Sequence, residues 1–118
     1  MILVDTSIWI EHLRNGLKLL IKELNEGRVL CHPFVIGELA CGNLKNRNEI
    51  LRLLTSLPEV QVARHSEVLE LVESNRLYSR GLGWIDMHLV TSALLTGCHL
   101  WTKDKRLHSA ANELEISI

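Results

Sequence analysis

Short apolar runs alternate with longer segments of helical periodicity along the whole chain. The runs at 2–4, 29–31, 60–63, 99–102 and 115–118 are predicted strands, and helical patterns fill most of the sequence between them. Residues 2–4 form a continuous apolar run, which is typical of a strand buried on both faces of a parallel sheet. The alternation predicts βαβ units, and therefore an α/β protein built around a mainly parallel sheet.

Glycine, proline and acidic residues mark the ends of the predicted helices. Gly16 and Gly27 close the first two, and Pro33 fits the first turn of the third. Asp86 and Asp104 begin the last two helical patterns, and Asp86 follows a glycine-rich break in the chain. These signals predict several short helices rather than one long one.

Composition places the chain among ordinary folded proteins. Its 118 residues, 47% of them hydrophobic, are enough for one well-filled core, so a single domain covering 1–118 is expected. The sequence shows no secretory signal and no membrane-spanning run. Three cysteines without a C-x-x-C pair suggest buried thiols in a reducing cytoplasm rather than disulfides or a zinc knuckle. The net charge of −1 neither suggests nor excludes nucleic acid.

Four acidic residues occupy positions where carboxylates are unusual. Asp5 ends the first apolar run, and each of the other three lies on the apolar stripe of a predicted helix: Glu38, Asp86 and Asp104. Burying an unpartnered carboxylate is costly, so such groups are normally hydrogen-bonded, neutralised or bound to a metal. A divalent cation would neutralise all four at once. The pattern therefore suggests an enzyme that depends on acidic residues and a metal ion.

The chemistry of these side chains favours a hard cation. Ligands of open parallel α/β sheets bind beyond the carboxyl ends of the strands, where Asp5 and Asp104 are expected, and Glu38 lies in the helix after the second strand. Carboxylates without histidine or cysteine ligands favour Mg²⁺ or Mn²⁺ over zinc. Such a site can activate water for attack on phosphorus.

A simpler explanation stays open for three of the four acids. Asp5 is also explained as a turn residue, and Asp86 and Asp104 as helix caps. Glu38 lies several residues inside its predicted helix, where capping does not explain it. Glu38 therefore carries the most weight in the metal-site hypothesis.

Four separated motifs appear in the order and spacing of a PIN domain, and the sequence most resembles the VapC toxins of bacterial toxin–antitoxin pairs. The motifs are Val4–Ser7, Pro33–Leu39, Asp86–Leu89 and Trp101–Asp104. The resemblance covers essentially the whole chain. It implies a PIN-like α/β/α sandwich with a central, mainly parallel five-stranded sheet. It also implies an Mg²⁺- or Mn²⁺-dependent endoribonuclease that forms a homodimer and is neutralised by a VapB-type antitoxin.

The resemblance also assigns roles to individual residues. Asp5, Glu38, Asp86 and Asp104 match the acidic quartet of the family, which implies that they hold the metal ion and carry catalysis. Thr6 and Thr102 match the hydroxyl positions beside the first and last acids. Helix capping explains Thr6 equally well, so its role stays open.

Several functions compete at this point. The first is a toxin that cleaves structured RNA such as tRNA or ribosomal RNA, and a housekeeping RNA-processing nuclease without an antitoxin is the alternative. A phosphatase with Asp5 as nucleophile would resemble the haloacid-dehalogenase type, which requires a second Asp where this chain has Ser7. A non-enzymatic, Mg²⁺-binding receiver-like domain typically has paired acids near its start, and this chain lacks them.

Overall fold

The computed structural model describes all 118 residues and contains a short parallel sheet with seven helices around it. The strands are β1 (Ile2–Val4), β2 (Val29–Leu30) and β3 (His99–Trp101). The helices are α1 (Thr6–Asn15), α2 (Lys18–Asn25), α3 (Pro33–Cys41), α4 (Arg47–Ser56), α5 (His65–Ser74), α6 (Trp84–Thr96) and α7 (Lys105–Glu113). The predicted α/β class and parallel sheet are therefore confirmed.

The sheet has the order β2-β1-β3, with both pairs parallel. It has three strands rather than the five expected. Next to the segment predicted as a strand at 60–63, Glu59 forms one parallel bridge to Cys31, and within the segment predicted at 115–118, Ser117 forms one to Leu100. Only two hydrogen bonds hold the first of them, from Cys31 N to Pro58 O (2.9 Å) and from Val60 N to Cys31 O (3.1 Å). One bridge on each side is too little pairing to form a strand.

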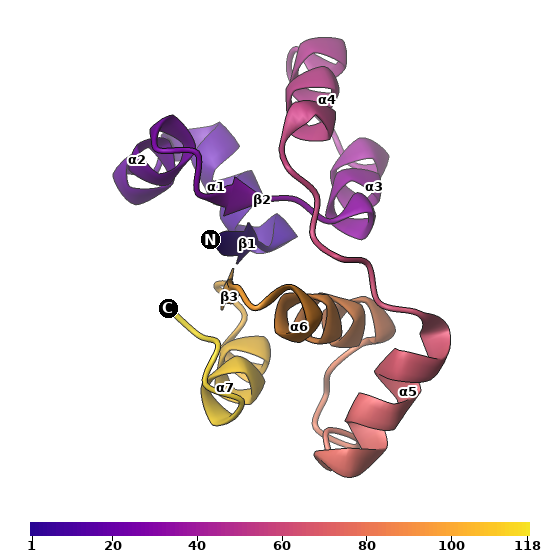
Figure 1. Ribbon diagram of the computed structural model, residues 1–118. Helices are drawn as coiled ribbons and strands as arrows, with labels where there is room; N and C mark the ends of the chain where they lie inside the picture. The colour runs from indigo at the N-terminus through magenta and orange to yellow at the C-terminus, as the bar shows by residue number, and fades with distance from the viewer.

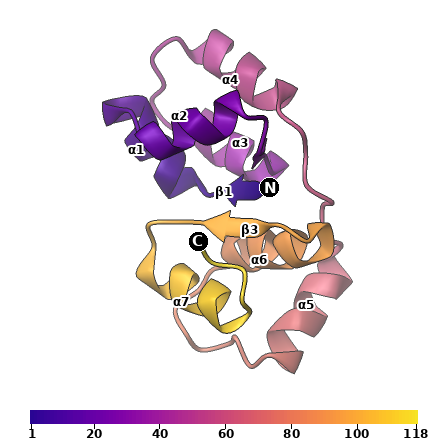
Figure 2. The same cartoon turned by 60° about the vertical axis from the view of Figure 1, so that its left-hand side comes forward.

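The two halves of the chain meet along the β1–β3 pair. In both views, α1 to α4 lie on one side of these strands and α5 to α7 on the other (Figures 1 and 2). Asp5 N donates to Trp101 O (2.9 Å), so the pairing continues to the carboxyl ends of both strands. Residues about 95 positions apart are thereby brought together at one edge of the sheet.

Helix α6 lies at the centre of this arrangement. Seven consecutive residues, 87–93, are buried, because α5 and β3 both pack against it. It ends at Gly97, whose φ of 75° is the left-handed conformation that glycine adopts without strain. The main core joins this helix to the strands through fully buried leucines such as Leu3, Leu89 and Leu100. None of the helices is long and apolar enough to cross a membrane.

His32 begins α3 and is completely buried. Its Nδ1 accepts a hydrogen bond from Phe34 N (2.9 Å), so the imidazole caps the helix, while Nε2 has no partner. Burial lowers the pKa of His32 to about 4, and the neighbouring His88 adds to the effect. The pKa of His88 is lowered as well, again mainly by burial. The folded state therefore favours the neutral form of both imidazoles.

We expect the protein to lose stability on mild acidification because of His32. Its folded pKa lies below the unfolded value of about 6.5, so the unfolded state takes up the proton first and stability falls from pH 6.5 toward pH 4. The free energy of unfolding should fall by up to about 1.4 kcal/mol per pH unit in that window. His32→Asn keeps a capping acceptor and should flatten the slope in urea unfolding between pH 7 and 5. The exposed control His108→Asn should keep the wild-type slope, and an unchanged slope in His32→Asn would contradict the assignment.

Candidate active site

Asp5 lies at the carboxyl end of β1 and caps α1. Its side chain is buried, with 7% of its surface exposed, and it accepts three hydrogen bonds. Oδ1 accepts from Thr6 N (2.7 Å), and Oδ2 accepts from Thr102 Oγ1 (2.6 Å) and Ser7 Oγ (2.9 Å). These bonds hold a buried carboxylate in one orientation without any cationic side chain.

A threonine links Asp5 to the second acid. Thr6 Oγ1 donates to Glu38 Oε1 (2.7 Å), so the carboxylate on α3 lies at the start of α1. Glu38 itself is exposed. Asp5 rather than Thr6 caps α1, and Thr6 links Asp5 through its backbone N to Glu38 through its hydroxyl.

A second threonine links Asp5 to the last acid. Thr102 Oγ1 donates to Asp5 and accepts a hydrogen bond from Asp104 N (3.0 Å). Asp104 caps α7 through Oδ1, which accepts from Arg106 N (2.9 Å) and Leu107 N (3.0 Å). Asp104 is exposed, so its carboxylate is open to solvent on the same edge of the sheet as Asp5.

Asp86 approaches the same cluster from α6. It is the third residue of that helix, half-buried, and its Oδ2 accepts from Gly83 N (2.9 Å) at the start of the helix. Burial raises the pKa of Asp86, the hydrogen bond from Gly83 opposes this, and the charges of Asp5 and Asp104 raise the pKa further. The three aspartates are therefore close enough to repel one another. We call Asp5, Glu38, Asp86 and Asp104 the acidic cluster.

Comparison with known proteins agrees with this geometry. Residues 2–113 match the family model of the PIN domain. The chain belongs to the PIN-domain family. It is 49% identical to Ribonuclease VapC32 of Mycobacterium tuberculosis, in each of two strains, over 119 residues that cover all of this chain and 96% of the relative. Within the family the chain therefore belongs with the VapC proteins.

A solved structure supports the same fold. The crystal structure of PAE2754 from Pyrobaculum aerophilum superposes with a TM-score of 0.62 and covers 92% of this PIN domain and 77% of the other chain. The two sequences are 19% identical, so the likeness concerns the fold alone. It confirms the α/β architecture with a parallel sheet expected from the sequence.

The burial expected for the four acids of this PIN domain is partly wrong. Asp5 is buried and Asp86 half-buried, but Glu38 and Asp104 are exposed. Helical periodicity shows that Glu38 shares a face with Phe34. It does not show whether other elements cover that face, and Phe34 is itself 37% exposed. The capping explanations for Asp86 and Asp104 hold too, because each accepts a backbone hydrogen bond at the start of a helix, and Asp5, expected as a turn residue, also caps one. Capping and clustering coexist in the same side chains.

The assignment of all four acids to one cation stays a prediction. No three side chains of His, Cys, Asp or Glu converge into a metal cage in this PIN domain. Mg²⁺ does not need such a cage, because it usually keeps several waters and binds one or two carboxylates together with phosphate oxygens of a substrate. Hard oxygen donors and mutual repulsion of three aspartates fit an ion of this kind.

Ser7 plays a part in the site that the sequence did not predict. Ser7 Oγ donates to Asp5 Oδ2 (2.9 Å) and accepts from Lys103 N (3.0 Å). It therefore holds the loop after β3 against the start of α1. The sequence does carry a signal for this role. Ser7 comes two residues after Asp5, which ends a predicted strand, so its hydroxyl lies on the first turn of the following helix.

Two basic side chains flank the acidic cluster in different ways. Lys103 Nζ pairs with Glu11 at 3.4 Å, so its charge is already partnered. Arg106 extends from α7 over Gly81, where a Cβ would come within 2.5 Å of its Nη1. Gly81 has a φ of 75°, so its backbone requires glycine, and the absence of a side chain leaves room for the guanidinium.

Proposed function

We propose that this PIN domain is a metal-dependent endoribonuclease and the toxin of a type II toxin–antitoxin pair. It hydrolyses phosphodiester bonds of structured RNA, such as tRNA or ribosomal RNA. The observation that carries the proposal is the buried Asp5 carboxylate, oriented by three hydrogen bonds and joined through Thr6 and Thr102 to two more acids. A relative that matches the full length of the chain carries the name ribonuclease, which supports the same conclusion.

Each acid has a distinct task in this proposal. Asp5, with both oxygens hydrogen-bonded, is the most rigid anchor for an ion, and Asp86 and Asp104 add negative charge beside it. Mg²⁺ or Mn²⁺ bound there would lower the pKa of a water molecule and neutralise charge on the phosphate. Glu38 is exposed and hydrogen-bonded through Oε1, so it can orient a water at the outer side of the cluster. Thr6 and Thr102 position the acids they contact.

The metal dependence gives the first test. Purified protein should cleave RNA, lose all cleavage in excess EDTA and regain it with Mg²⁺ or Mn²⁺. Ca²⁺ should support cleavage poorly. It is larger than Mg²⁺ and its coordination geometry is less strict, so it positions an attacking water less well. The assay is gel analysis of a mixture of tRNA and ribosomal RNA. Full cleavage in EDTA would contradict the proposal.

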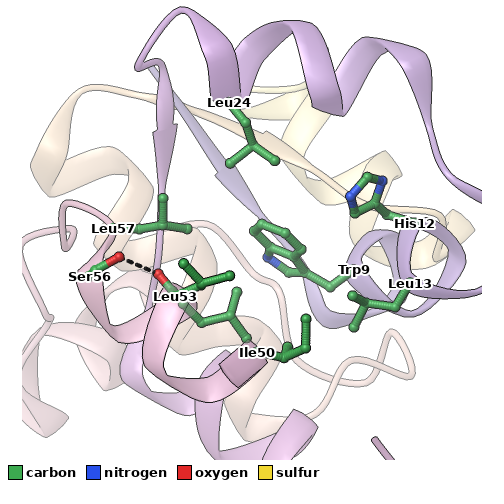
Figure 3. Close-up of a pocket in the computed structure, with 9 residues that line it drawn as sticks. Trp9, His12, Leu13, Leu24, Ile50, Leu53, Ser56 and Leu57 are labelled. Atoms are coloured by element: carbon green, nitrogen blue, oxygen red, sulfur yellow. Dashed lines mark hydrogen bonds between the residues drawn. The ribbon is translucent and has the colours of Figure 1, made fainter. Parts of the chain in front are cut away.

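An apolar pocket between α1, α2 and α4 supports the antitoxin part of the proposal (Figure 3). The pocket has a volume of about 280 Å³, and seven of its nine lining residues are hydrophobic. Leu53 is 50% exposed at its edge, and Trp9 lies buried beneath it with an Nε1 that has no acceptor in this chain. Exposed apolar surface gathered in one place marks partner sites. We propose that an apolar helix or strand of a VapB-type antitoxin occupies it.

The pocket continues toward the acidic cluster. A second cavity of about 700 Å³ shares Leu13 and Ile50 with the first and extends to Glu38. An antitoxin segment seated in the apolar pocket could therefore reach the acids along this path. A guanidinium at that end would pair with a carboxylate and compete with the metal ion. This arrangement would explain inhibition without any change of fold.

We also propose that the protein works in the cytoplasm as a homodimer, as the family resemblance implies. Large apolar side chains outside the pocket support self-association, among them Leu69 on α5 and Leu95 on α6, which are 48% and 37% exposed. Free Cys31, Cys41 and Cys98 agree with a reducing compartment. Light scattering of the purified chain should give about twice its 13.4 kDa mass, and a monomer would contradict the dimer.

A further inference from the structure

Two exposed aromatic rings lie beside the acidic cluster, in a chain with few aromatic residues. The sequence has one Phe, one Tyr and three Trp. Phe34 exposes 37% of its surface and Trp84 exposes 40%, whereas Trp9 is only 4% exposed. None of the functions proposed above uses Phe34 or Trp84.

Each ring is carried by a helix that also carries one of the acids. Phe34 precedes Glu38 by four residues on α3, so the two side chains are neighbours on one helical face. Trp84 is the first residue of α6, and the carboxylate of Asp86 turns back to Gly83 N at the same helix start. Phe34 therefore lies beside Glu38, and Trp84 lies on the first turn of α6, which also carries Asp86.

A buried histidine joins the two rings into one surface. The centroid of the His88 ring lies 4.8 Å from that of Phe34 and 4.8 Å from that of Trp84, with interplanar angles of 63° and 84°. Edge-to-face contacts of this kind are favourable. His32 lies behind Phe34 with a centroid distance of 4.9 Å, and His32 and His88 are 0% and 5% exposed. Phe34 and Trp84 are thus held in place before any ligand arrives, which lowers the entropy cost of binding.

The chemistry of this surface suits a nucleobase better than a phosphate. The acidic cluster can receive a phosphate only through a bound cation, and the Phe34 and Trp84 rings carry no charge that would attract one. Aromatic side chains bind single-stranded nucleic acid by stacking on bases, with little dependence on sequence. Bases inside an A-form helix are already stacked on each other, so only an unpaired base can use such a surface.

We propose that Phe34 and Trp84 stack an unpaired base next to the phosphodiester bond that is cleaved. The proposal rests on the ribonuclease function and deepens it, because it places the cut in a loop, bulge or single strand of a structured RNA. Phe34 and Trp84 are then substrate-binding residues, and His88 is a positioning residue that acts through their rings.

The test measures RNA binding without cleavage, in the Asp5→Asn background. The probes are a fluorescein-labelled pool of single-stranded RNA of random sequence and a fully paired RNA duplex of equal length. Adding Trp84→Ala should weaken binding of the single-stranded pool by about 5- to 100-fold, the effect of losing one stacked base. Trp84→Phe should keep most of the affinity, and binding of the duplex should change little. Tyr78→Ala, which removes an exposed aromatic ring with no contact to this surface, should bind like its parent.

Cleavage assays with Asp5 intact separate the possible failures. Trp84→Ala and Phe34→Leu should raise KM more than they lower kcat, because they remove binding that substrate and transition state share. If the wild type cleaves RNA and both variants, shown folded by circular dichroism, keep its KM and affinity, this inference alone is overturned. A change from dimer to monomer without loss of RNA affinity would also overturn it, since the rings would then contact a protein. Absence of cleavage by the wild type would instead remove the ribonuclease function itself.

Discussion

Asp5→Asn should lower RNA cleavage by on the order of 1000-fold or more while the protein stays folded. The loss should be at least as large as that from removing one preorganised electrostatic group in other enzymes. Asparagine has the same shape as aspartate, and its amide can still accept from Thr6 N and can donate to the hydroxyls of Ser7 and Thr102. The change therefore removes the charge and spares the hydrogen-bonding positions. Initial rates on a fixed RNA substrate, with thermal unfolding as the check on folding, measure the effect.

Two further variants serve as comparisons for Asp5→Asn. Asp86→Asn should be comparably inactive and more stable than wild type in EDTA at neutral pH, because it relieves burial of a charge and repulsion from Asp5 and Asp104. Glu70→Gln removes an exposed acid on α5 and should cleave RNA at the wild-type rate. Near-normal cleavage by Asp5→Asn would mean that the reaction takes place elsewhere.

Expression of the wild-type chain alone should stop bacterial growth, and this is the second large effect. A ribonuclease that cuts tRNA or ribosomal RNA removes the capacity for translation, so Asp5→Asn should allow normal growth at equal protein levels. Co-expression of the small reading frame next to the gene should restore growth and give a complex that co-purifies. Colony counts after induction measure both effects. Harmless expression of folded wild-type protein would remove the toxin function and favour housekeeping RNA processing.

The apolar pocket allows this growth test to examine the antitoxin contact. Leu53→Asp should remain toxic in the presence of the antitoxin, because a charge at the edge of the pocket should weaken the complex by about 2–4 kcal/mol, or 30- to 1000-fold. Leu19→Asp is the matched control: Leu19 on α2 is 48% exposed, much like Leu53 at 50%, but does not line the pocket. If both variants are rescued equally, the antitoxin binds another surface.

Sequence patterns predicted the part of the fold that local chemistry determines. The alternation of apolar runs and helical stripes placed β1, β2 and β3 correctly, and Gly16 and Pro33 marked helix ends that the structure confirms. The outer segments 60–63 and 115–118 were predicted as strands because they are rich in apolar residues. The structure has one bridge at Glu59, just before the first, and one at Ser117 in the second, since strand formation depends on the length of pairing with a neighbour, which one segment alone does not reveal.

The acidic cluster was predictable as a set but not in its connections. The positions of Asp5 and Asp104 after two strands indicated one edge of a parallel sheet, and the β1–β3 pairing brings them there. The exposure of Glu38 and the contribution of Ser7 depend on how α1, α3 and the loop after β3 pack. Periodicity within one helix carries no information about such packing.

Uptake of Mn²⁺ by the purified protein, followed as loss of the free-ion signal in electron paramagnetic resonance, tests the central claim most directly. It asks whether the acidic cluster binds a cation and requires no knowledge of the RNA. We predict that the wild type removes the signal, that excess Mg²⁺ restores it by competition, and that Asp5→Asn removes far less. Equal uptake by the two proteins, or none by either, would contradict a metal-dependent active site built on Asp5.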